Sequence, residues 1–213
     1  MNSTEKINKI FSILKKEVPK YNVPVIDLIK VQTKDPFKIL IATILSARTK
    51  DTITYKCAKR LFKKAKNFHE LRLLSQKDIE QLIYPVGFYK TKAKHLKELS
   101  YKIKMFNEKI PKNIPDLLKL PGVGRKTANL VLAVAFEKDA ICVDTHVHRI
   151  SNRLGYIKTK TPFDTEMALR KKLPKKYWKM INFYFVALGQ NICLPRKPKC
   201  GICPINKYCK KRI

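Results

Sequence analysis

Glycine and acidic residues are scarce in this chain of 213 residues. It holds six glycines and 16 Asp and Glu in total. The glycines are scattered, which excludes a long flexible linker or a low-complexity segment. Long apolar runs are absent as well, because the longest, from Phe37 to Ala47, contains Lys38 and Ser46. Such a run is too short to cross a bilayer, so we expect no membrane span.

Signals for β-structure and for export are also missing. No stretch alternates polar and apolar residues over a useful length, and neither Asn-Gly nor Asp-Gly occurs. The first 16 residues carry Ile7, Ile10, Phe11 and Leu14 at helical spacing, which predicts an amphipathic helix rather than a signal peptide. We therefore predict a cytoplasmic, nucleoid-associated protein with reduced thiols.

Helical periodicity runs through nearly the whole chain and predicts an all-α fold. Asp35-Pro36 opens a strongly apolar segment that we expect to be a central buried helix. Ser75 is a predicted N-cap, with Asp78 at the capping-box position. The helices expected from the pattern of apolar residues are Phe37–Ser46, Thr52–Lys63, Thr91–Phe106 and Arg125–Phe136, with a short one from Pro115 to Leu120.

Positive charge is what the sequence has in excess. Lys and Arg number 47, and the formal net charge is +31. So large a surplus repels itself in a compact chain, which favours a polyanionic partner. A lysine-rich proteome with solvated surface charges is the alternative. A membrane surface is less suitable, because no basic helix face is paired with an exposed aromatic stripe.

A two-glycine turn lies between two predicted helices, in Leu120-Pro121-Gly122-Val123-Gly124-Arg125. Glycines at Gly122 and Gly124 let the backbone turn sharply and approach a phosphate closely. Amides at the start of the next helix can then donate to the phosphate oxygens. The pattern predicts a helix–hairpin–helix that contacts DNA through Gly122, Val123, Gly124 and Arg125. The alternative is an ordinary corner between two helices.

Two further residues can carry covalent chemistry. Lys126 follows the turn directly, and Asp144 lies in Val143-Asp144-Thr145-His146. A lysine amine can attack C1′ of a deoxyribose, expel the base and form a Schiff base, while a carboxylate stabilises positive charge on the sugar. Taken singly, Lys126 would be a solvated phosphate contact and Asp144 an N-cap. Their joint occurrence in this frame favours the catalytic interpretation.

Four of the six cysteines crowd the C-terminus, in the pattern Cys193-x6-Cys200-x2-Cys203-x5-Cys209. These intervals differ from the paired Cys-x2-Cys sets of common zinc ribbons and fit a loop around a [4Fe–4S] cluster. A structural zinc knuckle is the alternative. The loop after Cys193 presents Arg196, Lys197 and Lys199, which suit a phosphate backbone. Cys57 and Cys142 are expected to be buried thiols.

Together, the hairpin with Lys126, the Asp144 segment and the cysteine ring resemble the endonuclease III family of DNA glycosylases. The resemblance covers most of the chain, from Asp35 to Cys209. It implies two helical lobes with damaged DNA in the cleft between them. Residues 28–138 would form a six-helix bundle with the hairpin, and residues 1–27 and 139–213 the iron–sulfur lobe, onto which the N-terminal helix folds back.

The resemblance also implies further DNA contacts. Arg48 stands where the family's gap-filling residue is a glutamine, so the reading of the orphan base is in question. Phe88 lies in a second wedge loop, where an apolar residue would press into the base stack. A core aromatic is the alternative for Phe88. His146 either contacts DNA or supports the Asp144 loop.

The predicted function is a bifunctional DNA glycosylase and abasic-site lyase for oxidised pyrimidines. It would act as a monomer on damaged double-stranded DNA, with no obligate protein partner. The first alternative is a mismatch-specific glycosylase on the same scaffold, removing adenine, or thymine opposite guanine. Lys126 and the short chain count against the adenine enzymes. The second alternative is a non-catalytic iron–sulfur DNA-binding protein, which the presence of both Lys126 and Asp144 disfavours.

Overall fold

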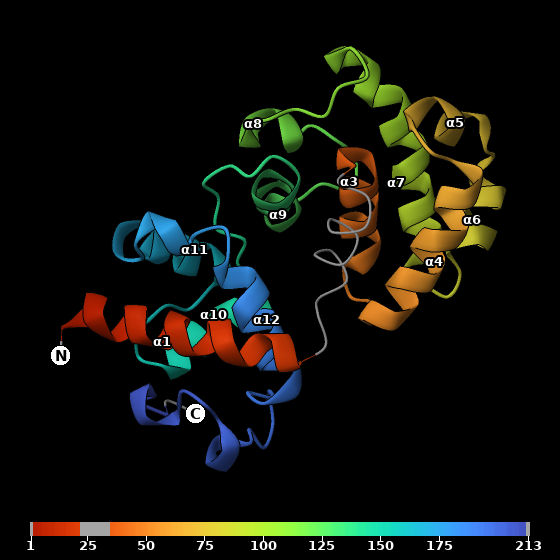
Figure 1. Ribbon diagram of the computed structural model, residues 1–213. Helices are drawn as coiled ribbons and strands as arrows, with labels where there is room; N and C mark the ends of the chain where they lie inside the picture. Colours follow the sequence, from red (N-terminus) through yellow and green to blue (C-terminus); the bar gives the residue numbers. More distant parts are fainter. Residues whose placement is uncertain (1, 22–34, 212–213) are drawn as a thin grey trace. The chain divides into compact units, whose positions relative to one another are not determined.

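The computed structural model describes residues 2–21 and 35–211 of the chain and is all-α, as predicted (Figure 1). No strand occurs in those two ranges. None of their helices is both long and apolar enough to cross a membrane. The chain divides into two compact units, Met1–Pro24 with Asp139–Ile213, and Val25–Lys138. The predicted boundary between residues 27 and 28 lies outside the described residues.

The unit Val25–Lys138 is organised around one buried helix. Its helices are α3 (Pro36–Ser46), α4 (Asp51–Lys64), α5 (Phe68–Leu73), α6 (Gln76–Ile83), α7 (Tyr89–Lys102), the 3₁₀ turn η2 (Ile103–Phe106), α8 (Ile114–Leu117) and α9 (Arg125–Ala135). Helix α3 packs against α4, α7 and α9. Its residues from Ile39 to Leu45 are all buried, which confirms the predicted central helix.

Helix ends in this unit are set by side chains that the sequence pattern had indicated. Asp35 caps α3, accepting from the amide of Phe37 at 2.9 Å. Ser75 and Asp78 form the predicted capping box at the start of α6. Helix α7 begins two residues before the predicted start. The predicted helix to Phe106 is α-helical as far as Lys102 and continues as the 3₁₀ turn η2.

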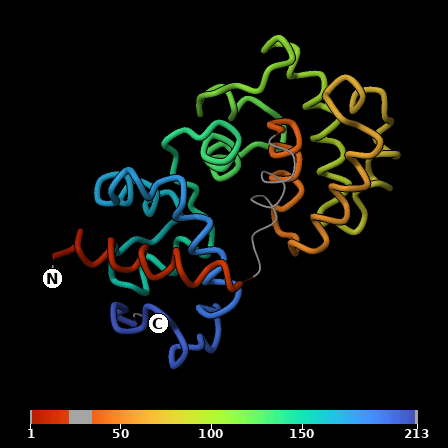
Figure 2. Tube along the Cα trace, viewed as in Figure 1, coloured from red at the N-terminus to blue at the C-terminus, as the bar shows by residue number. Residues whose placement is uncertain are grey.

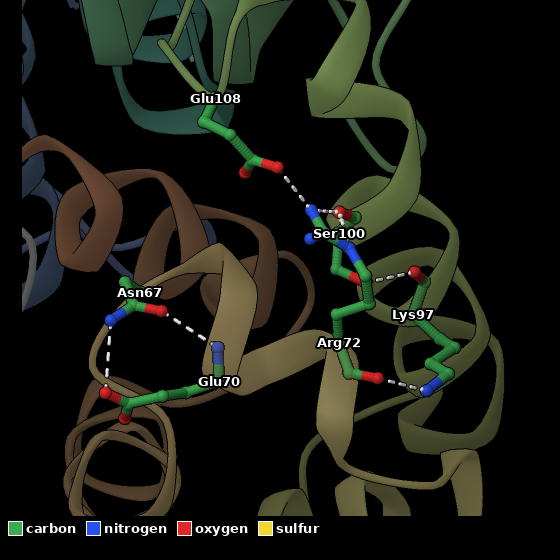
Figure 3. Close-up of polar contacts among 6 residues, drawn as sticks. All are labelled: Asn67, Glu70, Arg72, Lys97, Ser100 and Glu108. Carbon is green, nitrogen blue, oxygen red and sulfur yellow. Dashed lines mark hydrogen bonds and ion pairs between the residues drawn. The ribbon is translucent and has the colours of Figure 1, made fainter.

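A polar network on α5 and α7 ties these two helices together (Figure 3). Lys97 on α7 donates to the carbonyls of Arg72 and Leu74 at the end of α5, at 2.6 Å each. In return, Arg72 donates to the Ser100 carbonyl at 2.8 Å and to Glu108 at 2.7 Å. An ammonium at a helix C-terminus is favourable because the last carbonyls there lack intrahelical partners.

The second unit joins the two ends of the chain. Its elements are α1 (Ser3–Glu17), η1 (Val18–Lys20), α10 (Thr145–Arg153), α11 (Pro162–Lys172), η3 (Lys175–Tyr177), α12 (Ile181–Asn191), η4 (Cys200–Ile202) and η5 (Asn206–Tyr208). Figure 2 traces α1 in red among the blue C-terminal segments of this unit. The apolar face predicted for the N-terminus (Ile7, Ile10, Phe11, Leu14) is the buried face of α1.

The core of this unit brings α1 onto the helices that follow Asp139. Phe11 stacks on Tyr177 with ring centroids 3.9 Å apart and meets Tyr184 edge-on at 5.7 Å. Cys193, Cys203 and Cys209 pack against the same apolar cluster. Each fully buried aliphatic or aromatic side chain contributes roughly 1.5–3 kcal/mol, so α1 is an integral part of the fold that carries the cysteines.

Candidate functional site

The two-glycine turn joins α8 to α9 as predicted. Gly122 has a φ of 77°, a left-handed conformation that few other residues adopt. A Cβ there would lie 3.2 Å from the Cβ of His95, so the turn also packs tightly against α7. The amide of Val123 donates to the Leu120 carbonyl at 3.1 Å and closes the turn.

Gly124 is the N-cap of α9 and has a different role from Gly122. Its φ of −91° is open to any residue, and a Cβ there would meet nothing within 4 Å. The fold therefore does not require glycine at this position. With no capping side chain at Gly124, the first turn of α9 can present its amides to an anion. Arg125 and the exposed Lys126 are the first two residues of α9 and belong to this first turn.

Asp144 is the N-cap of α10. One carboxylate oxygen, Oδ1, accepts from the amides of His146 and Val147, at 2.9 Å each. The other oxygen, Oδ2, accepts no hydrogen bond from the described part of the chain. Capping and chemistry are thus compatible, because one oxygen fixes the carboxylate while the second remains for another partner. Asp144 belongs to the unit of α1 and α10, whereas Lys126 belongs to the unit of α3 and α9.

His146 lies in the first turn of α10, where its ring contacts protein. Its Nδ1 is 3.0 Å from Nη2 of Arg149, and that guanidinium donates to the Cys193 carbonyl at 2.8 Å. A Cβ on Gly189 would lie 2.3 Å from the same Nδ1, so the ring packs directly on α12. This packing favours the supporting role for His146 over direct contact with DNA.

The four C-terminal cysteines line one pocket, together with Arg153 and Ile192 among others. Burial raises the pKa of the Cys203 and Cys209 thiols, and the neighbouring thiols raise it further. Four thiolates so placed need a positively charged centre among them, which iron provides. Cys57 and Cys142 are buried elsewhere, as predicted.

Zinc and a [4Fe–4S] cluster place different demands on their thiolate ligands. In residues 2–21 and 35–211, no three His, Cys, Asp or Glu side chains converge on a single metal-ion position. Tetrahedral zinc needs its sulfurs at about 2.3 Å from one ion. A [4Fe–4S] cluster gives each thiolate its own iron and needs them spread around a larger body. The four cysteines that line this pocket supply the number of thiolates that such a cluster requires.

Arg153 fixes the backbone of the basic loop that follows Cys193. Its guanidinium donates to the carbonyls of Leu194 at 2.7 Å and Pro195 at 2.8 Å. The side chains of Arg196, Lys197 and Lys199 are exposed. The loop thus has a fixed backbone and exposed cations, an arrangement suited to a phosphate backbone.

Arg48 and Phe88 come together although 40 positions separate them. Both have left-handed backbone conformations, with φ of 53° and 58°. The Arg48 guanidinium lies over the Phe88 ring, 5.6 Å from its centroid. Phe88 is 62% exposed, so the alternative of a core aromatic is wrong. An exposed aromatic ring and a cation side by side are suited to a nucleic-acid base.

Comparisons with known proteins agree with this set of features. Residues 41–175 match the family model of HhH-GPD superfamily base excision DNA repair proteins. Residues 193–209 match the iron-sulfur binding domain of endonuclease III. Endonuclease III of Thermotoga maritima is 47% identical over 177 residues, which are 83% of this chain and 83% of that protein.

Two solved structures have the same fold. The structure of a trapped endonuclease III–DNA covalent intermediate matches with a TM-score of 0.85 at 33% identity, over 99% of this chain and 97% of that one. A thermostable thymine-DNA glycosylase matches with a TM-score of 0.83 at 29% identity, over 99% and 98%.

This chain belongs to the endonuclease III family. It is a base excision repair DNA glycosylase and abasic-site lyase that binds DNA, and its predicted [4Fe–4S] cofactor is confirmed by the match to the iron–sulfur domain.

One buried polar residue was not predicted from the sequence. Lys92 on α7 is 7% exposed, and its Nζ donates to the carbonyls of Leu45 and Ala47. Burial, with a contribution from the nearby charge of Lys126, lowers its pKa to about 8. It therefore stays mostly an ammonium at pH 7. The signal in the sequence is its position, because Lys92 falls four residues before Leu96 on the apolar face of α7.

The two hairpin glycines should respond differently to substitution by serine. Gly122→Ser should lower the free energy of unfolding by about 2 kcal/mol, because the left-handed backbone and the contact with His95 both oppose a side chain. Gly124→Ser should leave stability unchanged, since serine is a good N-cap. It should nevertheless weaken duplex binding by about tenfold, because its hydroxyl competes for the amides that face a phosphate.

Urea unfolding and duplex titration of both variants would measure these effects. Equal destabilisation by the two substitutions, or native DNA affinity in Gly124→Ser, would contradict the separate roles of the two glycines.

Proposed function

We propose that this enzyme removes oxidised pyrimidines and then cleaves the strand by β-elimination through a Schiff base on Lys126. The observation that carries the proposal is the position of Lys126, exposed in the first turn of α9, directly after the glycine turn. Hairpin amides that hold a phosphate would bring the adjoining sugar within reach of this amine. A related structure, that of a trapped endonuclease III–DNA covalent intermediate, supports covalent chemistry.

The proposed reaction assigns each group a step. The neutral Lys126 amine attacks C1′, and the glycosidic C1′–N bond breaks as the base leaves with the bonding electrons and takes up a proton. Loss of a proton from the amine and opening of the sugar ring give the Schiff base. Removal of a C2′ proton then expels the 3′ phosphate, and water releases the lysine.

Asp144 has two tasks in this proposal. Its carboxylate stabilises the positive charge that develops on the sugar as the base departs, and it accepts the proton of the attacking amine. The amides of His146 and Val147 hold Oδ1, which leaves Oδ2 as the oxygen for these tasks. His146, packed against Arg149, keeps the start of α10 in place.

Binding is proposed to rest on separate surfaces. Gly122, Val123, Gly124 and Arg125 hold a phosphate at the hairpin, and Arg196, Lys197 and Lys199 hold the backbone beside the cluster. Arg48 and Phe88 fill the space that the extruded nucleotide leaves. The monomeric state and the cytoplasmic location stay predictions.

The cluster is proposed to be held by Cys193, Cys200, Cys203 and Cys209. When bound, it supplies a rigid, four-point cross-link to the C-terminal loop. Arg153 then holds the loop backbone, and the exposed cations of the loop make the phosphate-binding surface. No chemical step is assigned to the cluster.

A thymine-mismatch glycosylase is the second candidate. It is favoured by the match to a thermostable thymine-DNA glycosylase, whose identity of 29% is close to the 33% of the endonuclease III structure. The two functions share the scaffold and differ in the base that is removed.

Borohydride trapping on a panel of duplexes distinguishes these functions. The duplexes would carry an oxidised thymine, a plain abasic site, thymine opposite guanine, or no lesion. We expect covalent complexes with the first two alone. Trapping on the mismatch would move the specificity to the second candidate.

Lys126→Ala should abolish trapping on every duplex while duplex binding falls by less than about tenfold, because it removes the nucleophile and one positive charge. Lys119→Ala is the matched control, an exposed lysine before the same turn, and should trap like the wild type. Undiminished trapping by Lys126→Ala would exclude it as the nucleophile.

Asp144→Asn should slow base removal by about 100-fold or more in single-turnover kinetics, since it deletes a charge at the reacting sugar. Asparagine is as good an N-cap as aspartate, so the free energy of unfolding should stay within about 0.5 kcal/mol. A near-native rate would remove Asp144 from the mechanism.

Cys200→Ser should lower the iron content and the broad visible absorption of the purified protein, because a thiolate ligand is lost. Cys57→Ala is the control, a buried cysteine outside the ring, and should keep both signals. Full iron in Cys200→Ser, or stoichiometric zinc in the wild type, would refute the ligand assignment.

A further inference from the structure

Arg48 and Phe88 lie in two loops, residues 47–50 after α3 and residues 84–88 before α7, which we call the wedge loops. Both residues have backbone conformations that need support from their neighbours. A left-handed backbone is unfavourable at a non-glycine residue and persists only where neighbours impose it. The Arg48 guanidinium lies over the Phe88 ring, but both side chains are exposed, and this contact joins them only to each other. The support must come from the backbone beneath them.

Lys92, on α7, is hydrogen-bonded to the first of these loops. Its Nζ donates to the carbonyls of Leu45 at 2.8 Å and Ala47 at 2.5 Å, and to Oγ1 of Thr49 at 3.2 Å. These three acceptors bracket Arg48 in the sequence. An ammonium has three N–H donors, and these acceptors use all of them.

The same contacts join the two loops. Oγ1 of Thr49 also accepts from the amide of Gly87, at 3.2 Å, so one hydroxyl connects Lys92 with the residue before Phe88. A Cβ on Gly87 would come within 2.6 Å of the Arg48 carbonyl, which shows how closely the loops approach. Displacing the Lys92 ammonium would thus release both loops.

We propose that Lys92 is a positioning residue, which holds Arg48 and Phe88 in the arrangement with which they enter the duplex at a lesion. This inference rests on the wedge role proposed above for Arg48 and Phe88. Through that arrangement, Lys92 determines how strongly the enzyme prefers a lesion to intact DNA, because only at a lesion is there a gap to fill.

A merely structural role for Lys92 is the competing explanation, and the chain contains a matched case. Lys97, on the same helix, also donates to two carbonyls at the end of a helix, those of Arg72 and Leu74. These hydrogen bonds tie α7 to α5 rather than to either wedge loop. If Lys92 only stabilised a helix end, loss of either ammonium would have similar consequences.

The test compares Lys92→Met with Lys97→Met in the full-length holoprotein. The dissociation constant is measured for a duplex with a tetrahydrofuran abasic-site analogue and for the same duplex without a lesion. A 2-aminopurine opposite the analogue reports by fluorescence whether the gap is filled. We expect Lys92→Met to lower the ratio of the two affinities by about tenfold and to abolish the fluorescence change. Lys97→Met should keep the ratio within about twofold.

Arg48→Ala separates failure of this inference from failure of the proposed function. It should lower the same ratio, and Lys92→Met added to it should lower the ratio little further, because both changes act through one contact. If Arg48→Ala keeps the native ratio, the wedge role is wrong. If Arg48→Ala loses the ratio and Lys92→Met retains it, the positioning role of Lys92 is overturned.

Thr49→Val provides a second variant in case Lys92→Met does not fold. It removes the hydroxyl that Lys92 and Gly87 share, at a half-buried position, and valine has nearly the same shape as threonine. It should lower the affinity ratio by about threefold, with the fluorescence change reduced. A native ratio in Thr49→Val, with Lys92→Met unfolded, would also overturn the inference.

Discussion

A surplus of cations that carboxylates cannot neutralise is the constraint on which much of this structure depends. Lys and Arg number 47 and Asp and Glu 16, so most cations need other acceptors. In the described residues, many of them donate to carbonyls at helix ends, where the last C=O groups lack an intrahelical partner. Lys92 does so at α3, Lys97 at α5 and Arg149 at α12. Each of these bonds fixes the path by which the chain leaves a helix.

The residues proposed for function follow from that use of helix ends. Lys126 stands in the first turn of α9, Asp144 caps α10, and Phe88 immediately precedes α7. Helix starts offer amides and a partial positive charge, which suit phosphates and fix a carboxylate. Cations that do not serve the fold, such as Arg196 and Lys199, remain exposed for a polyanion. The backbone amides and carbonyls that lack partners at helix ends thus contribute both to stability and to binding.

Much of this could be predicted from the sequence, because the features concerned are local. The apolar spacing of the first 16 residues names the buried face of α1, and Asp35-Pro36 marks the start of α3. Ser75 and Asp78 form a capping box because the two residues are three apart. The glycine turn and the cysteine intervals identify the family since both are short, contiguous patterns whose chemistry depends on spacing. The sequence by itself determined the fold class, the cofactor, the kind of chemistry and the helices with clear apolar periodicity, but it did not predict α5, α11 or α12.

Tertiary structure alone decided which distant groups meet. Arg48 lies over Phe88, and Lys92 reaches the carbonyls of another helix, because packing of α3 on α7 brings Leu45 and Lys92 together. Likewise, the packing of His146 on Gly189 depends on how α10 lies against α12. Hydrogen bonds act over about 3 Å, whereas periodicity in a sequence says only which face of a helix is buried and not what lies against it.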